Sequence, residues 1–448
     1  MSKMSNLVEK IKRREARIAV IGLGYVGLPL AVEKAKAGFH VTGIDRNAER
    51  VARVNQGENY IPDILNVDLE QAVKAGRLVA TQEFDVISDV DVITICVPTP
   101  LDKNKNPDTS FISYVVERSL PYLRPHQLLV LESTTYPGTT EEVILPQLQK
   151  RGFSVGKDYY LAFSPERVDP GNHQYKVKNT PKVVGGVTPA CTEAAKALYE
   201  TIVESEVFAV SSPRVAEMTK LLENIFRIVN VSLVNEMAML CHRMGIDIWE
   251  VVEAAKTKPF GFMPFYPGPG MGGHCIPIDP FYLAWKAKEY DFSTRFIELA
   301  GEINDSMPEY VVEQVSEILN RHRKCLNGAR ILMLGMAYKK DTDDLRESPA
   351  LKVALSLVER GAALSYHDPF IPACQVSGSE LRSVEFTPAR LRECDLVLIT
   401  TDHSCVDYRT VAEHAPLVYD TRNAFSDHSN PRIYRLGAPA PGWRPHHD

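Results

Sequence analysis

Residues 17–31 read RIAVIGLGYVGLPLA, and this stretch decides the fold. Residues 18–21 are apolar and rich in β-branched side chains, which is the composition of a strand buried on both faces. Three glycines follow in the spacing Gly-x-Gly-x-x-Gly, and a second apolar segment begins after the last of them. The stretch therefore predicts a strand, a tight glycine turn and a helix.

A second apolar strand at residues 40–44 ends in Asp45, about 20 residues beyond the turn, as a dinucleotide fingerprint requires. Gly22 permits the tight turn, Gly24 lets a pyrophosphate approach the backbone, and Gly27 lets the helix pack closely on the strand. Asp45 can accept hydrogen bonds from ribose hydroxyls and repels a 2′-phosphate, which favours NAD over NADP. The alternative is a Rossmann-like domain without a cofactor.

Polar loops follow three further predicted strands. The strands at 91–97 and 127–131 end in the loops 98–102 and 132–138. Ligands bind outside the carboxyl ends of parallel strands, so these loops predict a cofactor and substrate rim, or else plain β–α turns. After residues 160–163 comes SPERVDPG, in which Glu166 and Asp169 are general bases, substrate contacts or merely exposed loop charges.

From Pro213 the apolar period changes to that of a helix and continues to about Met244. This long helix is too apolar to be solvated all round and predicts a bridge between domains or a dimer interface. Lys220 and Asn224 lie four residues apart and share one face. The lysine is either snorkelling or a partly desolvated base.

The segment GPGMGGHCIPIDP at residues 268–280 combines glycines with Cys275 and Asp279. Glycines let the backbone approach a ligand, so Cys275 on such a loop predicts a nucleophilic thiol with polar partners. An incidental buried cysteine in a turn is the alternative.

A second α/β set begins at residue 330. It carries Gly335-Met336-Ala337 without the other two glycines, so we expect no second dinucleotide site. Lys339, Lys340 and Arg346 suggest contacts to a phosphorylated ligand, or a solvated basic loop. The fold class expected is α/β, with two Rossmann-like doubly wound domains joined by a long central helix and a helical middle domain. The expected parts are residues 1–210, 211–325, 326–436 and a flexible tail at 437–448.

Bulk properties narrow the function. The 448 residues carry a net charge of −6, and no basic stripe suggests nucleic-acid binding. Eight scattered cysteines without a Cys-x-x-Cys pair indicate a reducing compartment and no structural metal site. The charged N-terminus is unlike a signal peptide, and charges interrupt the most apolar stretch, so we expect a cytoplasmic protein without a membrane span.

These motifs together resemble nucleotide-sugar 6-dehydrogenases, the UDP-glucose/GDP-mannose dehydrogenase family, over residues 17–425. The motifs are Gly22–Gly27, Glu-Ser-Thr at 132–134, Ser-Pro-Glu-Arg at 164–167, Lys-x-x-x-Asn at 220–224, Gly-Gly-x-Cys at 272–275 and Lys-Lys-Asp-Thr at 339–342. Ile278 and Asp169 depart from the UDP-glucose pattern, which has lysine and glutamate there, and are most similar to the UDP-N-acetylhexosamine branch.

The resemblance implies a four-electron oxidation of a UDP-sugar by NAD, through a thioester on Cys275, in a homodimer or higher homo-oligomer formed by the central helix. It implies three sets of site residues. The catalytic set is Cys275, Lys220, Asn224, Asp279, Glu166 and Thr134. The NAD set is Gly22, Leu23, Gly24, Tyr25, Val26, Gly27, Asp45, Arg50, Val97, Pro98, Thr99, Thr134 and Arg346. The substrate set is Glu166, Arg167, Val168, Asp169, Lys220, Asn224, Phe265, Tyr266, Gly272, Tyr338 and Lys339.

Two other functions compete with this interpretation. A two-electron dehydrogenase of the 3-hydroxyacid type has a Rossmann domain, a long helix and a lysine–asparagine pair, but it needs no thiol in a glycine loop. A non-catalytic NAD-binding regulatory protein would bind NAD without producing NADH on any UDP-sugar.

Overall fold

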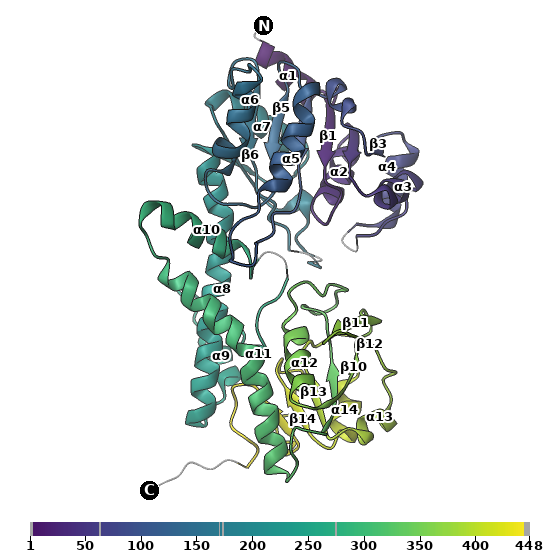
Figure 1. Cartoon of the computed structure of the whole chain (residues 1–448), viewed down its shortest axis with the longest axis vertical. Coiled ribbons are helices and arrows are strands. Elements are labelled where there is room, and N and C mark those ends of the chain that lie inside the picture. Colours follow the sequence, from purple (N-terminus) through teal and green to yellow (C-terminus); the bar gives the residue numbers. More distant parts are fainter. Residues whose placement is uncertain (1–2, 62–63, 170, 173, 274–275, 443–448) are drawn as a thin grey trace. The chain divides into compact units, whose positions relative to one another are not determined.

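A computed structural model describes residues 3–61, 64–169, 171–172, 174–273 and 276–442 (Figure 1). The chain divides into two compact units. Met1–Glu223 with Phe281–Phe292 form the first, and Asn224–Pro280 with Ser293–Asp448 form the second.

An eight-stranded sheet organises the first unit, in the order β3-β2-β1-β4-β5-β6-β7-β8. The first six positions have the doubly wound order that brings the carboxyl ends of β1 and β4 together at the switch point. All neighbouring strands are parallel except β6 and β7, which are antiparallel. The strands are β1 (Arg17–Ile21), β2 (His40–Ile44), β3 (Leu78–Thr81), β4 (Val92–Ile95), β5 (Leu128–Leu131), β6 (Tyr160–Phe163), β7 (Lys182–Gly186) and β8 (Val207–Val210).

Helices cover both faces of this sheet, which is why β1 is apolar throughout after Arg17. Ile18 and Val20 face a core shared with α1, α2 and α7, while Ala19 and Ile21 face a core shared with α5 and α6. The helices of this unit are α1 (Lys3–Lys12), α2 (Gly27–Lys36), α3 (Ala48–Gln56), α4 (Asn66–Lys74), α5 (Ser110–Ser119), α6 (Leu145–Lys150) and α7 (Pro189–Glu200).

The long helix expected from the apolar period is α8 (Pro213–Met244), with 32 residues. It begins in the first unit and ends in the second, where Gly245 follows with φ of 70°. Beyond it lie α9 (Ile248–Ala255), α10 (Asp279–Ala287) and α11 (Arg295–Arg321).

A five-stranded parallel sheet organises the second unit, in the order β10-β9-β13-β14-β15. Ile331 and Met333 of β9 face a core shared with α8, α9, α11 and α12, and Leu332 and Leu334 face a core with α13 and α14. The elements are β9 (Arg330–Leu334), α12 (Pro349–Glu359), β10 (Ala363–His367), β11 (Ala373–Val376), β12 (Ser379–Arg382), α13 (Pro388–Glu393), β13 (Leu396–Ile399), α14 (Tyr408–His414), β14 (Val418–Asp420) and β15 (Ile433–Arg435). The expected fold class is confirmed.

The start of the expected flexible tail needs correction. Gly437 and Ala438 are buried. The carbonyl of Gly437 accepts from the backbone N–H of Ile248 at 3.0 Å, and that of Ala438 lies 2.9 Å from the ring Nδ1 of His242. The indole N–H of Trp249 donates to Leu436 O at 2.8 Å. The segment therefore supplies acceptors that the start of α9 needs, and it is part of the fold.

Within the described ranges, no helix is apolar over a stretch long enough to traverse a lipid bilayer.

Candidate active site

The glycine turn between β1 and α2 has a physical reason for each glycine. A Cβ on Gly22, whose φ is 93°, would lie 2.4 Å from the carbonyl oxygen of Cys96, and one on Gly27 would lie 1.7 Å from Gly22 O. A Cβ on Gly24 would meet no heavy atom within 4 Å. Gly22 and Gly27 are therefore needed by the fold itself, while Gly24 borders open space that fits the close approach of a pyrophosphate.

Asp45, at the end of β2, faces this turn and is 7% exposed. Its carboxylate accepts from the backbone N–H of Leu23 (2.8 Å) and of Asn47 (2.9 Å), and the Arg50 guanidinium lies 3.6 Å away. The Tyr60 hydroxyl donates to Leu23 O at 2.7 Å, and burial together with the Asp45 charge raises its pKa to about 12. The structure thus brings together the glycines, Asp45 and Arg50 of the expected NAD set. Tyr25 is exposed, and Val26 is the N-cap of α2.

The loops after β4 and β5 are tied to each other. Val97 donates its N–H to Ser133 Oγ (2.9 Å), and the Thr99 hydroxyl donates to Thr134 O (2.6 Å). The hydroxyl of Tyr282 on α10 donates to Thr99 O. Val97, the exposed Pro98, Thr99 and Thr134 therefore form one connected rim.

Glu166 lies just beyond β6 with both carboxylate oxygens bonded. Oε1 accepts from the N–H groups of Arg167 (2.7 Å) and Val168 (2.8 Å), and Oε2 accepts from Lys182 Nζ at 3.0 Å. Burial alone raises the pKa of Glu166, but Lys182 and the two N–H groups outweigh it and hold the pKa below its ordinary value. The Arg167 guanidinium turns instead to Glu223, at 2.6 Å, and Asp169 is half-buried.

Helix α8 carries Lys220 and Asn224 on successive turns, and both are buried, at 8% and 9% exposure. Lys220 belongs to the first unit and Asn224 to the second. Asn224 Nδ2 donates to Asp279 Oδ2 at 2.6 Å, at the start of α10, so the structure brings these two expected residues together. Cys275 lies outside the described residues.

The loop before Cys275 is held by buried amides that sequence analysis did not assign. Asn235 of α8 accepts from the Gly268 N–H (2.9 Å), and Asn304 of α11 accepts from the Met271 N–H (2.7 Å). The only signal for them was a polar residue inside an apolar helical pattern. Gly273 donates its N–H to Arg346 O at 2.9 Å.

Aromatic residues complete the surroundings of this loop. Phe265 packs edge-on against Phe226, and Tyr266 stacks on Trp249 and donates to Glu253 at 2.7 Å. A Cβ on Gly272 or Gly273 would lie 2.7–2.8 Å from the side chain of Tyr338. The glycines here allow two loops of the second unit to pack together.

The partly buried Arg422 also lies beside this loop, and no sequence signal marked it. A Cβ on Gly268 would lie 2.7 Å from its Nη1. Burial lowers the pKa of Arg422, and its Nε donates to Thr400 O at 2.8 Å.

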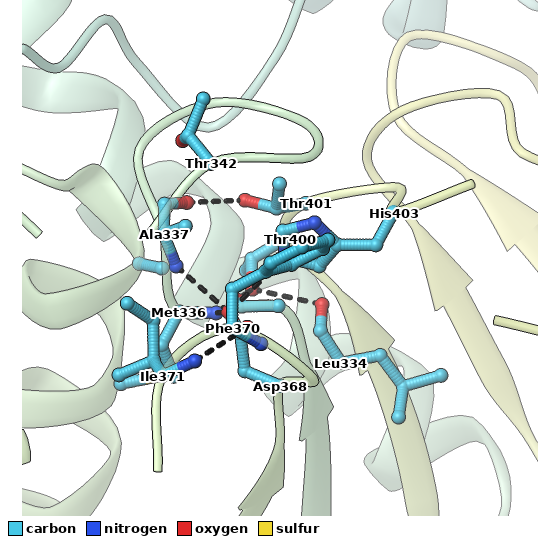
Figure 2. A network of polar contacts seen from close by, with 12 residues as sticks. Leu334, Met336, Ala337, Thr342, Asp368, Phe370, Ile371, Thr400, Thr401 and His403 are labelled. Atoms are coloured by element: carbon cyan, nitrogen blue, oxygen red, sulfur yellow. Dashed lines mark hydrogen bonds and ion pairs between the residues drawn. The ribbon is translucent and has the colours of Figure 1, made fainter. Parts of the chain in front are cut away.

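The loop after β9 is fixed by a polar network around Asp368 and His403 (Figure 2). Asp368 accepts from the N–H groups of Met336 (2.6 Å) and Ala337 (3.0 Å), and His403 Nε2 lies 3.1 Å away. His403 Nδ1 accepts from the Asp341 N–H at 3.0 Å, so Nε2 carries the proton and donates it to Asp368.

This network holds the loop that carries the expected phosphate-contacting residues. The Thr342 hydroxyl donates to the carbonyl of Lys339 at 2.9 Å, and Lys339 is half-buried. Arg346, expected to contact NAD, belongs to the second unit, where it makes a bidentate pair with Asp344.

Three relatives illustrate what this chain is similar to. The UDP-N-acetyl-D-glucosamine 6-dehydrogenase of Pseudomonas aeruginosa is 37% identical over 361 residues, covering 80% of this chain and 84% of that protein. The NDP-N-acetyl-D-galactosaminuronic acid dehydrogenase of Ralstonia nicotianae is 37% identical over 425 residues, covering 91% and 96%. The solved structure of a UDP-D-ManNAc dehydrogenase from Pyrococcus horikoshii has a TM-score of 0.86 at 31% identity, covering 94% of this chain and 99% of that one.

Family models match in three consecutive segments. The NAD binding domain of the UDP-glucose/GDP-mannose dehydrogenase family matches residues 16–203, its central domain matches 214–306, and its UDP binding domain matches 332–427. Because these matches span most of the chain and agree with the glycine turn and Asp45, this chain belongs to the UDP-glucose/GDP-mannose dehydrogenase family and is an NAD-dependent nucleotide-sugar dehydrogenase acting on a UDP-sugar.

Proposed function

We propose that this enzyme oxidises the 6-hydroxyl of UDP-N-acetylglucosamine to the carboxylate, giving a uronate for surface-polysaccharide (O-antigen or capsule) synthesis. NAD⁺ is the hydride acceptor in both oxidations. The residues proposed to hold it are those of the glycine turn with Asp45, Arg50, the rim from Val97 to Thr99, Thr134 and Arg346.

The first oxidation needs a base for the proton of the 6-hydroxyl. We propose that Lys220, Asn224 and Asp279, acting with water, remove this proton. The support is that all three side chains are buried and that Asn224 donates to the Asp279 carboxylate at 2.6 Å, which leaves that carboxylate oriented.

Cys275 then forms the covalent intermediate. Its thiolate adds to the aldehyde carbon, and the alkoxide is stabilised by Lys220 and Asn224. Loss of hydride from that carbon gives a thioester. Water adds to the thioester carbonyl, the C–S bond breaks, and the thiol and the carboxylate are released.

Glu166 is the proposed base for this water, with Thr134 helping to orient it. The observation that carries the four-electron assignment is the Glu166 carboxylate, which is ionised at neutral pH and oriented by three donors. A two-electron dehydrogenase has no use for a second base of this kind.

The sugar is assigned from residues and relatives. Ile278 and Asp169 differ from the UDP-glucose pattern, and the Pseudomonas aeruginosa relative is named for UDP-N-acetyl-D-glucosamine. The alternative substrates are UDP-GalNAc, UDP-ManNAc and UDP-glucose. The proposed substrate contacts are Glu166, Arg167, Val168, Asp169, Lys220, Asn224, Phe265, Tyr266, Gly272, Tyr338 and Lys339. We also propose residues 1–210, 211–325 and 326–436 as the NAD-binding, central and UDP-binding domains.

We propose that a second copy of the chain covers α8. Val215, Met218, Leu222, Phe226, Leu233, Leu240 and Met244 recur at helical spacing and are each 38–59% exposed. An apolar row of this length is typical of an interface. Light scattering on Leu222→Glu with Phe226→Glu tests this, because charges on the row should dissociate the oligomer, and an unchanged mass would contradict it.

The test of function is the NADH yield at limiting UDP-GlcNAc, UDP-GalNAc, UDP-ManNAc or UDP-glucose. We expect two NADH per UDP-GlcNAc and less turnover with the other sugars. One NADH per sugar would contradict the covalent route, and no NADH with any sugar despite NAD binding would favour the regulatory function. Cys275→Ala should abolish uronate formation, and Glu166→Gln should leave a thioester that intact-protein mass spectrometry detects.

A further inference from the structure

Four charged side chains of the first unit form a buried chain that ends at Glu166. Lys34 of α2 contacts Glu132 at 3.4 Å, Glu132 contacts Lys182 of β7 at 3.1 Å, and Lys182 contacts Glu166 at 3.0 Å. The side chains of Lys34 and Glu132 are 0% exposed, that of Lys182 is 4% and that of Glu166 is 13%. Only the Glu166 end reaches solvent.

Positive and negative side chains alternate along this chain of charges, which lowers the free-energy cost of burying them. A single buried ion carries a large desolvation cost, so each charge needs an opposite neighbour and further hydrogen bonds. Lys34 also donates to the Thr94 hydroxyl at 3.0 Å, and Lys182 lies 5.2 Å from the ring centre of Tyr199. Two cations and two carboxylates leave the chain of charges neutral as a whole.

The other titratable groups around Glu166 do not replace Lys182. Burial and the Glu132 charge raise the pKa values of Cys96 and Tyr199, so both stay uncharged. The Arg167 guanidinium pairs with Glu223. Among the described residues, Lys182 is therefore the cation bonded to the Glu166 carboxylate.

We propose that Lys182 is a positioning residue, which, anchored by Glu132 and Lys34, keeps the Glu166 carboxylate ionised and aimed at the hydrolytic water. During hydrolysis a water proton moves to Glu166 as the oxygen bonds to the thioester carbon. The C–S bond then breaks, and the proton passes to the departing thiolate. The nearby Lys182 ammonium disfavours the protonated carboxyl, so Glu166 returns promptly to its basic form. This inference rests on the proposed role of Glu166.

Lys182→Met, with Lys182→Arg as the matched control, tests the proposal. Loss of the cation should raise the pKa of Glu166 by about one unit or more, and thioester hydrolysis at slightly acidic pH should slow about tenfold. Formation of the thioester should be unchanged, and Lys182→Arg should behave like the wild type. Glu132→Gln should move the pKa of Glu166 in the opposite direction, because Lys182 then has Glu166 as its only carboxylate.

The titration is read directly by ¹³C NMR of carboxyl-labelled glutamate, with the Glu166 signal assigned by its loss in Glu166→Gln. A Glu166 pKa that is the same in wild type, Lys182→Met and Glu132→Gln would overturn the proposal. If Lys182→Met does not fold, the other two variants decide the proposal. The pKa of Glu166 should then be lowered in Glu132→Gln and equal to the wild-type value in Lys182→Arg. Failure of the proposed function is distinct, because it appears as normal thioester hydrolysis in Glu166→Gln itself.

Discussion

The turns that follow β1 and β9, the first strands of the two sheets, share a backbone conformation and differ in what they leave accessible. Gly22 and Gly335 both have positive φ, 93° and 89°, and a Cβ on either would lie 2.4 Å from a carbonyl oxygen of a neighbouring strand end. In both turns the residue after this glycine donates its backbone N–H to a carboxylate that follows the neighbouring strand. Leu23 donates to Asp45, after β2, and Met336 donates to Asp368, after β10.

The difference lies in the next position and in the carboxylate. Gly24 borders open space, whereas Ala337, at the corresponding place, is fully buried. The Asp368 carboxylate accepts hydrogen bonds from four backbone N–H groups and from His403, so all of its bonding capacity is used to hold its own loop. The carboxylate at this position therefore lies beside open space in the first turn and is fully occupied by its own loop in the second, where Ala337 fills the adjacent position.

Gly335→Ala should have the largest effect. The clash with Thr401 O and the positive φ should lower the free energy of unfolding by about 3–5 kcal/mol. Urea denaturation measures this, with Gly378→Ala, also at positive φ but with no neighbour within 4 Å, as the control for φ alone. Equal losses in both variants would show that the strand-end contact is unimportant.

Asp368→Asn should destabilise by about 2–4 kcal/mol at neutral pH, because the N–H donors and His403 lose their charged acceptor. Burial raises the pKa of Asp368, but His403 and the N–H groups outweigh it and hold the pKa below its ordinary value. This stabilisation is therefore present above the unfolded pKa of about 3.9 and is lost as the pH falls through the folded pKa. Thermal unfolding from neutral to acidic pH should show the variant and the wild type converging, and a constant gap would contradict the assignment.

Gly24→Val should weaken NAD binding about 30-fold, or about 2 kcal/mol, because side-chain atoms occupy the space beside the turn. Unfolding should be unaffected, since the space around Gly24 is open. Calorimetric titration with NAD measures the loss, and UDP binding serves as the control. Unchanged NAD affinity would show that the open space at Gly24, which distinguishes it from Ala337, is not used by the cofactor.

Asp45→Asn should have the smallest effect, about 1 kcal/mol in NAD affinity, with NADP binding improved. The amide keeps an oxygen acceptor for Leu23 N–H and loses the one for Asn47 N–H. Asp368 instead holds four N–H groups and His403, so we expect unfolding to change far less in Asp45→Asn than in Asp368→Asn. A stability loss equal to that of Asp368→Asn would show that the two carboxylates do the same work.

The local sequence patterns predicted the elements that depend on neighbours along the chain. The strand, glycine turn and helix at residues 17–31 and the limits of α8 follow from period and from glycine, because backbone conformation responds to residues a few positions away. Glu166, Asn224 and Asp279 became candidates in another way, through the resemblance of their motifs to a known family.

Partners far apart in the sequence were decided by the tertiary structure alone. Lys34 lies 98 positions before Glu132 and Lys182 lies 50 positions after it, and only the strand order places them in one buried chain of charges. Likewise, nothing in the residues around Asp368 indicated that His403, 35 positions on, would occupy its carboxylate. The sequence by itself determined the central strands of both sheets, the glycine turns and the family. The neighbours of each buried charge depend instead on sheet order and register, which no local period encodes.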